Sequence, residues 1–168
     1  MKFKHFLILS ITALGLTACG IYSFRGTSIK PDVKTITINL FEYKALTVNP
    51  TLANDLTEAL RDQFRKMTNL EQLDYDGDLE ITGEITGYDV RATAITAGDM
   101  ASQNRLTVSV KVNFTNMKHP EEDFSNKSFS AYSDFDATTS LDSVESTLVA
   151  EIIDTIIEDI FNATVAQW

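Results

Sequence analysis

The sequence has one cysteine and two histidines among its 168 residues. A single cysteine excludes a disulfide within the chain, and two histidines leave little material for a histidine-based catalytic or zinc site. Basic residues are also scarce, with 14 Lys and Arg against 24 Asp and Glu. This balance argues against nucleic acid as a partner, because binding a phosphate backbone requires an excess of cationic side chains.

The N-terminal apolar run, residues 6–16, is too short to cross a membrane. It follows two lysines and ends in the letters LTAC at 16–19, which resemble the lipobox of bacterial lipoproteins. We therefore expect residues 1–18 to be a lipoprotein signal peptide and Cys19 to carry diacylglycerol and an N-acyl chain. The alternative is an ordinary cleaved signal peptide, or a short membrane anchor, in which the cysteine is incidental.

Gly20 stands where an Asp would indicate retention in the inner membrane by the enterobacterial sorting rule. We therefore expect a lipid-anchored protein on the periplasmic side of the outer membrane. Loss of residues 1–18 removes two lysines and no acid, so the formal charge falls from −10 by two units to −12. No linker or repeat divides the rest, which predicts a lipidated tether over 19–32 and a single domain over 33–168.

Residues 33–43 are rich in β-branched and aromatic side chains, which predicts a strand. Asn49 and Pro50 predict the cap and first position of a helix, whose apolar side chains recur every three or four residues until Thr68. Asp76-Gly77 is a pair typical of a tight hairpin turn before the next strand.

Two further strands alternate apolar and polar side chains. In residues 79–88 the apolar face includes Gly83 and Gly87, which we expect to admit a close helix or to place a bulge, while Tyr88 falls on the polar face. Residues 105–114 alternate most clearly and predict one buried face. Residues 96–104 form a long loop between these strands.

An aromatic-rich last strand is predicted over 124–135, and a final helix begins at Thr139 or Ser140 with a wide apolar stripe and acids opposite it. The order β-α-β-β-β-α predicts an α+β fold. In it, two helices pack on one face of a small, mostly antiparallel or mixed, four-stranded sheet.

The residues indicate no catalytic or metal site. His119 lies in a polar turn beside Pro120, where we expect it to be solvated. Asp74 opens an alternating acidic series, but Gly77 comes fourth instead of sixth and Ile85 occupies the twelfth position, so a calcium loop does not fit. We predict no enzyme activity, no metal and no cofactor beyond the covalent lipid.

Five features together resemble the LptE family, lipopolysaccharide-assembly lipoproteins of the outer membrane, in its Bacteroidota-type form. They are the lipobox with GIYSF at 20–24, NPTLANDLTEALRDQF at 49–64, GDLEITGEITGYD at 77–89, QNRLTVSVKVNFTN at 103–116 and the acidic, isoleucine-rich final helix. The resemblance implies a lipid-anchored partner that plugs the LptD β-barrel and helps to deliver lipopolysaccharide to the outer leaflet. It also implies two helices on a small sheet.

Some members of that family bind lipopolysaccharide, for which Arg91, Arg105 and Lys111 are the candidate glycolipid contacts. An acidic chain should repel an anionic glycolipid unless such residues converge, and scattered, solvated charges are the alternative. Two other functions remain open. One is a periplasmic lipoprotein adaptor of another envelope or secretion complex, which binds through an open sheet edge. The other is a carrier with a lipid pocket between helices and sheet.

Overall fold

Three long strands form the antiparallel part of the sheet in the computed structural model, which describes residues 28–93 and 103–166. They are β4 (Leu79–Ala92), β5 (Gln103–Asn116) and β6 (Phe124–Asp136), and each pairs with the next along nearly its whole length. The predicted alternation in β5 is confirmed, since its five apolar residues from Leu106 to Phe114 are at most 1% exposed. The signal peptide, Cys19 and most of the expected 96–104 loop lie outside the described residues.

Three short strands complete a mixed sheet of six. They are β1 (Thr35–Ile38), β2 (Glu42–Tyr43) and β3 (Glu71–Gln72). The order is β3-β1-β4-β5-β6, with β2 extending the line of β1 along β4. All pairings of these short strands are parallel. With six strands the sheet is larger than the predicted four-stranded sheet, whereas the predicted α+β class is confirmed.

The predicted hairpin at Asp76-Gly77 is wrong, because β1 lies between β3 and β4 and runs parallel to both. Gly77 is needed there for a different reason. A Cβ on this residue would lie 2.6 Å from the backbone nitrogen of Thr37. The Gly77 N–H also donates to the Thr37 hydroxyl at 3.0 Å, so the chain passes directly against β1.

Helix α2 (Leu52–Met67) begins two residues later than predicted, with Thr51 instead of Asn49 at the cap position. Asn49 still serves the helix start, because its side-chain oxygen accepts the backbone N–H groups of Thr51 and Leu52 at 3.2 and 3.1 Å. Pro50 therefore precedes the helix. The predicted end near Thr68 is confirmed.

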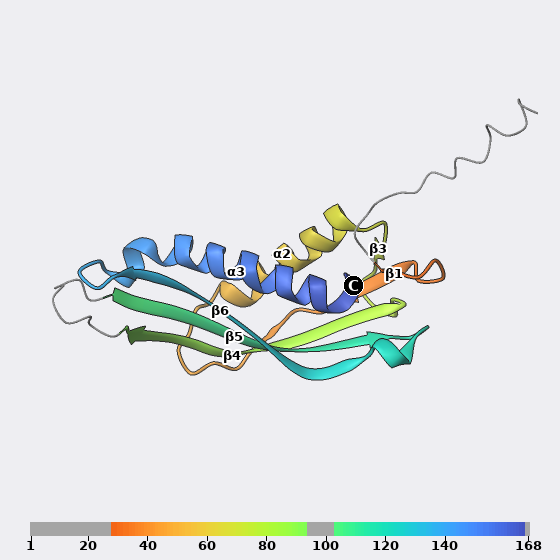
Figure 1. Ribbon diagram of the computed structural model, residues 1–168, viewed down its shortest axis with the longest axis horizontal. Coiled ribbons are helices and arrows are strands. Elements are labelled where there is room, and N and C mark those ends of the chain that lie inside the picture. The colour runs from red at the N-terminus through yellow and green to blue at the C-terminus, as the bar shows by residue number, and fades with distance from the viewer. Residues whose placement is uncertain (1–27, 94–102, 167–168) are drawn as a thin grey trace, which may run out of the picture.

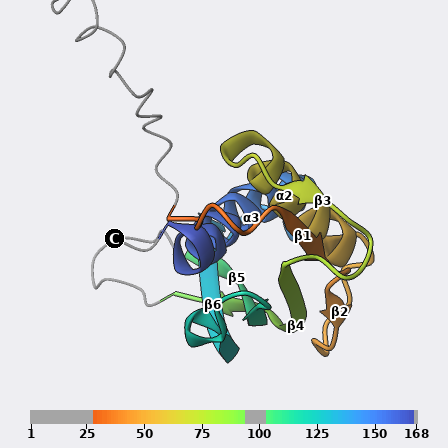
Figure 2. The same ribbon diagram turned by 90° about the vertical axis from the view of Figure 1, so that its right-hand side faces the viewer.

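Both helices lie on the same face of the sheet, as predicted (Figure 1). Helix α3 (Leu141–Val165) begins after Ser140 and runs along β5 and β6, while α2 lies beside it over β1 and β3 (Figure 2). The rings of Phe64 and Phe161 meet edge to face at 5.0 Å between the helices. Within the described part of the chain, no helix is long and apolar enough to cross a membrane.

The two glycines of β4 have different uses. Gly83 leaves room for the ring of Phe41, which would lie 2.3 Å from an added Cβ, so a side chain and not a helix approaches the sheet here. Gly87 follows a register shift after Ile85, which confirms the bulge. The shift moves Tyr88 to the buried face, where it is 3% exposed, so its predicted outward position is wrong.

Candidate functional site

The described chain starts beside the end of α3. The Ser28 N–H donates to the carbonyl oxygen of Val165 at 2.7 Å, and the Ser28 hydroxyl contacts the same oxygen at 3.2 Å. Any lipid on Cys19 would therefore be attached nine residues before this point. We call this region, with the 3₁₀ turn η2 (Pro120–Glu122), the anchor end of the domain.

Ion pairs join the first described residues to the turn between β5 and β6. The Lys30 ammonium lies 3.0 Å from Glu121 and 2.8 Å from Glu122. His119 Nε2 contacts the Asp32 carboxylate at 3.0 Å, and this contact lowers the pKa of Asp32. His119 thus helps to hold the N-terminal segment against the domain. Its place in a polar turn did not indicate this contact with Asp32.

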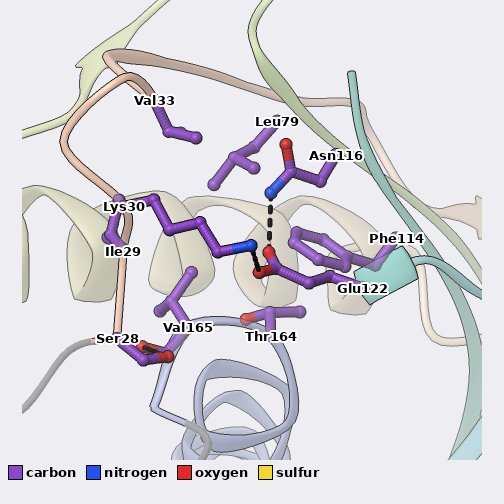
Figure 3. A pocket seen from close by; sticks show the side chains of 10 residues that line it. All are labelled: Ser28, Ile29, Lys30, Val33, Leu79, Phe114, Asn116, Glu122, Thr164 and Val165. Carbon is purple, nitrogen blue, oxygen red and sulfur yellow. Dashed lines mark hydrogen bonds and ion pairs between the residues drawn. The ribbon is translucent and has the colours of Figure 1, made fainter. Parts of the chain in front are cut away.

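A cavity of about 10 Å³ lies inside the anchor end (Figure 3). Apolar side chains of Val33, Leu79 and Phe114 line it together with the hydrogen-bonded side chains of Glu122 and Asn116. This volume suits at most a single water and is far too small for an acyl chain. The anchor-end cavity therefore gives no support to the lipid-carrier alternative.

The face of β4–β6 away from the helices is polar. Along the centre of this outer face run Thr107, Ser109 and Ser130, and the two serine hydroxyls are hydrogen bonded at 3.0 Å. Tyr132 is 56% exposed on the same face. The short hydroxyl side chains give the centre of the outer face a row of hydrogen-bonding groups.

The structure brings Arg91 and Arg105 together, because they are direct partners in the β4–β5 register. Arg105 is already engaged. Its Nε and Nη2 lie 2.7 and 2.8 Å from the two carboxylate oxygens of Asp134, and its guanidinium stacks 3.6 Å over the Tyr132 ring. The hydrogen bonds from Arg105 lower the pKa of the Asp134 carboxyl.

Lys111 does not converge with the two arginines. It lies six residues further along β5, which corresponds to roughly 20 Å. There it lines a polar hollow of about 150 Å³ with Lys44, Asn113 and Asn126, opposite Glu84. The three candidate residues thus lie at two separate places on the outer face, Arg91 with Arg105 at one and Lys111 at the other.

A partly buried polar network was not predicted from the sequence. The Glu145 carboxylate of α3 accepts hydrogen bonds from the Tyr88 hydroxyl and, at 3.0 Å, from the Asn49 side-chain amide. Burial, and then the bond to Glu145, raises the pKa of Tyr88. No pattern could have shown this network, because it depends on the bulge that turns Tyr88 inward.

No group of three or more His, Cys, Asp or Glu side chains that could hold a metal ion occurs in residues 28–93 and 103–166. The polar contacts described above join elements of the fold to one another. The features described are therefore a polar outer face, an ion-paired anchor end and a network between strand and helix.

Solved structures share this fold at low sequence identity. The hypothetical protein CT253 from Chlamydia trachomatis aligns with a TM-score of 0.52 and 7% identity over 79% of this chain and 98% of its own. The uncharacterized lipoprotein B from Nitrosomonas europaea aligns with a TM-score of 0.51 and 9% identity over 76% and 79%. A search of curated protein sequences gave no match.

The two helices on one face of a mixed sheet define the fold class, and a family match makes the class of protein specific. The model of the LptE family, described as lipopolysaccharide-assembly, matches residues 33–164. The chain belongs to this family. It is thus a lipopolysaccharide-assembly lipoprotein of a family that is neither enzymatic nor cofactor-dependent.

Proposed function

We propose that this protein is the outer-membrane lipoprotein that partners and plugs an LptD-like β-barrel during lipopolysaccharide transport. The observation that carries the proposal is the family match over residues 33–164, nearly the whole described domain. In this proposal Cys19 bears the lipid, residues 1–18 are the signal peptide, and the protein stays on the periplasmic side.

The shape and polarity of the domain support a plug. Strands of 13 and 14 residues extend for roughly 45 Å, and the 25 residues of α3 lie along them. Barrel interiors are polar, and the outer face with its serine, threonine and paired charges is suited to such a surface. A stiff, elongated domain can fill a lumen without rearranging.

The anchor end supports attachment through Cys19. Nine residues separate Cys19 from Ser28, a reach of at most about 30 Å, so the lipid would keep the anchor end close to the membrane. Such tethering raises the local concentration of the domain around a membrane-embedded partner. Since Lys30 and Asp32 are paired with the domain, the C-terminal part of the proposed 19–32 tether is held against it.

Affinity purification of the full chain from detergent-solubilised outer membrane tests this function, with Cys19→Ala as the control. We expect a large β-barrel in stoichiometric amount with the acylated protein and much less with the control. Recovery of soluble periplasmic proteins in place of a barrel would instead favour the adaptor function, for which the long edge strand β6 offers a binding edge.

Glycolipid contact is a separate part of the proposal. Arg91, Arg105 and Lys111 are its candidate residues, and Arg91 and Lys111 are tested together because Arg105 is held by Asp134. The variant Arg91→Glu/Lys111→Glu should bind purified lipopolysaccharide more weakly than Lys66→Glu, which changes a charge on the helix layer. Equal affinities of the two variants would remove the glycolipid site.

A further inference from the structure

A hollow of about 300 Å³ lies on the helix layer, where the start of α2 adjoins the N-terminal third of α3. We call it the helix groove. Its lining has an apolar and a polar part. Val149, Ala150 and Ile153 of α3 are the apolar residues, which we call the strip, and Asn49, Thr51, Asp55, Glu145 and Ser146 are the polar residues, which we call the rim. The groove lies well along α3 from the anchor end.

The rim is negatively charged. Among the residues that the structure describes, no Lys or Arg lines the groove. Across the described part of the chain, neither Asp55 nor Glu145 forms an ion pair. Glu145 is held in position by its hydrogen bonds to Tyr88 and Asn49. An apolar strip beside two carboxylates, one of which is held in position, suits a Lys or Arg side chain, whose aliphatic stem packs on the strip while its charge meets the rim.

Two exposed aliphatic side chains precede the rim residue Asn49 in the chain. Leu46 is 101% exposed and Val48 is 75% exposed, three residues and one residue before Asn49. Single exposed apolar residues are common, but two of them this close in the chain to a groove with an apolar strip favour protein binding. The occupant should therefore carry an apolar side chain next to its cation.

Once residues 1–18 are removed, as proposed, the rest of this chain cannot supply that occupant. Arg25 is three residues from Ser28, a reach of about 11 Å, whereas Ala150 lies 15 residues before Val165 on α3, roughly 22 Å from the Ser28 contact. Residues 94–102 and 167–168 contain no Lys or Arg. The cation must come from another polypeptide.

We propose that the helix groove, with Leu46 and Val48, binds a segment of a partner protein in which a Lys or Arg stands next to an apolar side chain. This deepens the proposed function, on which it rests, by naming the surface through which the barrel partner is held. This contact adds to the one that the polar outer face of the sheet makes with the barrel interior in the proposed function.

Site-specific photo-crosslinking of the full lipidated chain in the native envelope tests the groove. A photoreactive amino acid replaces Ala150 in the groove or, as the matched control, Thr155, which is exposed five residues further along α3. Position 150 should crosslink to a barrel peptide that contains a Lys or Arg beside an apolar residue. Position 155 should give at most a tenth of that yield.

Charge reversal identifies the role of the rim. Adding Asp55→Lys to the chain that carries the probe at position 150 should lower the crosslinking yield at least tenfold. Asp154→Lys makes the same change outside the groove and should leave the yield unaltered. Both variants should first show the melting temperature of the parent protein. A crosslink insensitive to Asp55→Lys would overturn the proposal.

The outcomes also separate the two proposals. If the barrel copurifies but positions 150 and 155 crosslink equally or not at all, the groove is overturned and the proposed function stands. A crosslink to a second copy of this chain overturns the groove as well. If no barrel copurifies but position 150 captures a basic and apolar peptide of another protein, the groove is supported and the barrel partnership fails.

Discussion

The two halves of the sheet are stabilised differently. Strands β4, β5 and β6 pair over 13 or 14 residues, whereas β1, β2 and β3 contribute only two to four residues each. Side chains reinforce the short, parallel half. The Arg61 guanidinium donates to the carbonyl oxygen of Ile38 at 2.6 Å, and the Phe41 N–H donates to the buried Thr57 hydroxyl at 3.1 Å. Short strands thus depend on a few individual residues, while long strands spread their stability over many.

The largest effect should follow Phe41→Ala in the parallel half. The Phe41 ring is 1% exposed and packs on Gly83, so its removal leaves a cavity and should lower the free energy of unfolding by about 4 kcal/mol. Urea unfolding followed by circular dichroism measures this change. Leu40→Ala, at a neighbouring residue that is 60% exposed, is the control and should cost below about 0.5 kcal/mol.

A smaller loss should follow Gly77→Ala, because the added Cβ meets backbone atoms of β1 that side-chain rotation cannot move. We expect about 3 kcal/mol, measured by the same unfolding experiment. Gly87→Ala is the matched control in β4, where the nearest contact of the added Cβ is an ordinary side-chain atom 3.3 Å away. Equal losses at both glycines would contradict the close passage of the chain at β1.

Asp78→Ala should cost about 1.5 kcal/mol at pH 7. The Asp78 carboxylate accepts the backbone N–H groups of Lys34 and Thr35 at 2.8 and 3.1 Å, and these bonds lower its pKa. Because the folded pKa is depressed, the stabilisation is complete above the unfolded value of about 3.9 and is lost as the pH falls through the folded pKa.

The difference in unfolding free energy between wild type and Asp78→Ala should therefore be constant from about pH 5 to 7 and shrink below about pH 4. Unfolding titrations at a series of pH values measure it. Asp74→Ala removes an exposed acid from the same connection and is the control, which should leave the unfolding free energy at pH 7 nearly unchanged. A difference that grows on acidification would disprove the role of the carboxylate.

The smallest effect is expected for Arg105→Gln in the antiparallel half. Its ion pair with Asp134 lies on the exposed outer face, where solvent screens charges, and the β5 ladder remains intact without it. We expect no measurable change in the urea midpoint. A loss as large as that of Asp78→Ala would show that the long strands also rely on individual side chains.

The same contrast explains what the sequence could predict. The alternation in β5 and the apolar stripes of α2 and α3 follow from burial of one face, so both patterns can be recognised in the sequence. Strands β2 and β3, with two residues each, are too short to show a period. The Asp76-Gly77 pair has the chemistry of a hairpin, and only the insertion of β1 between β3 and β4 excludes one.

The candidate contacts were predicted less completely for a similar reason. Sequence reasoning could name Arg91, Arg105 and Lys111 as candidate cations and place Arg105 and Lys111 on outward positions, but the grouping of the three depends on cross-strand register. The helix groove joins residues about 100 positions apart in the chain, and its fixed rim depends on the Tyr88 bulge. Neither arrangement has a local signature.

The parallel insertion of β1 also has a consequence for the order of folding. Partners in the β4–β5 turn region, such as Ala92 and Asn104, are 12 residues apart, whereas Ile36 and Leu79 of the β1–β4 pair are 43 residues apart. Closing the longer loop costs more chain entropy, so we expect the three-stranded meander to form before β1 inserts. The strand nearest the lipid attachment point would then be the last to join the sheet.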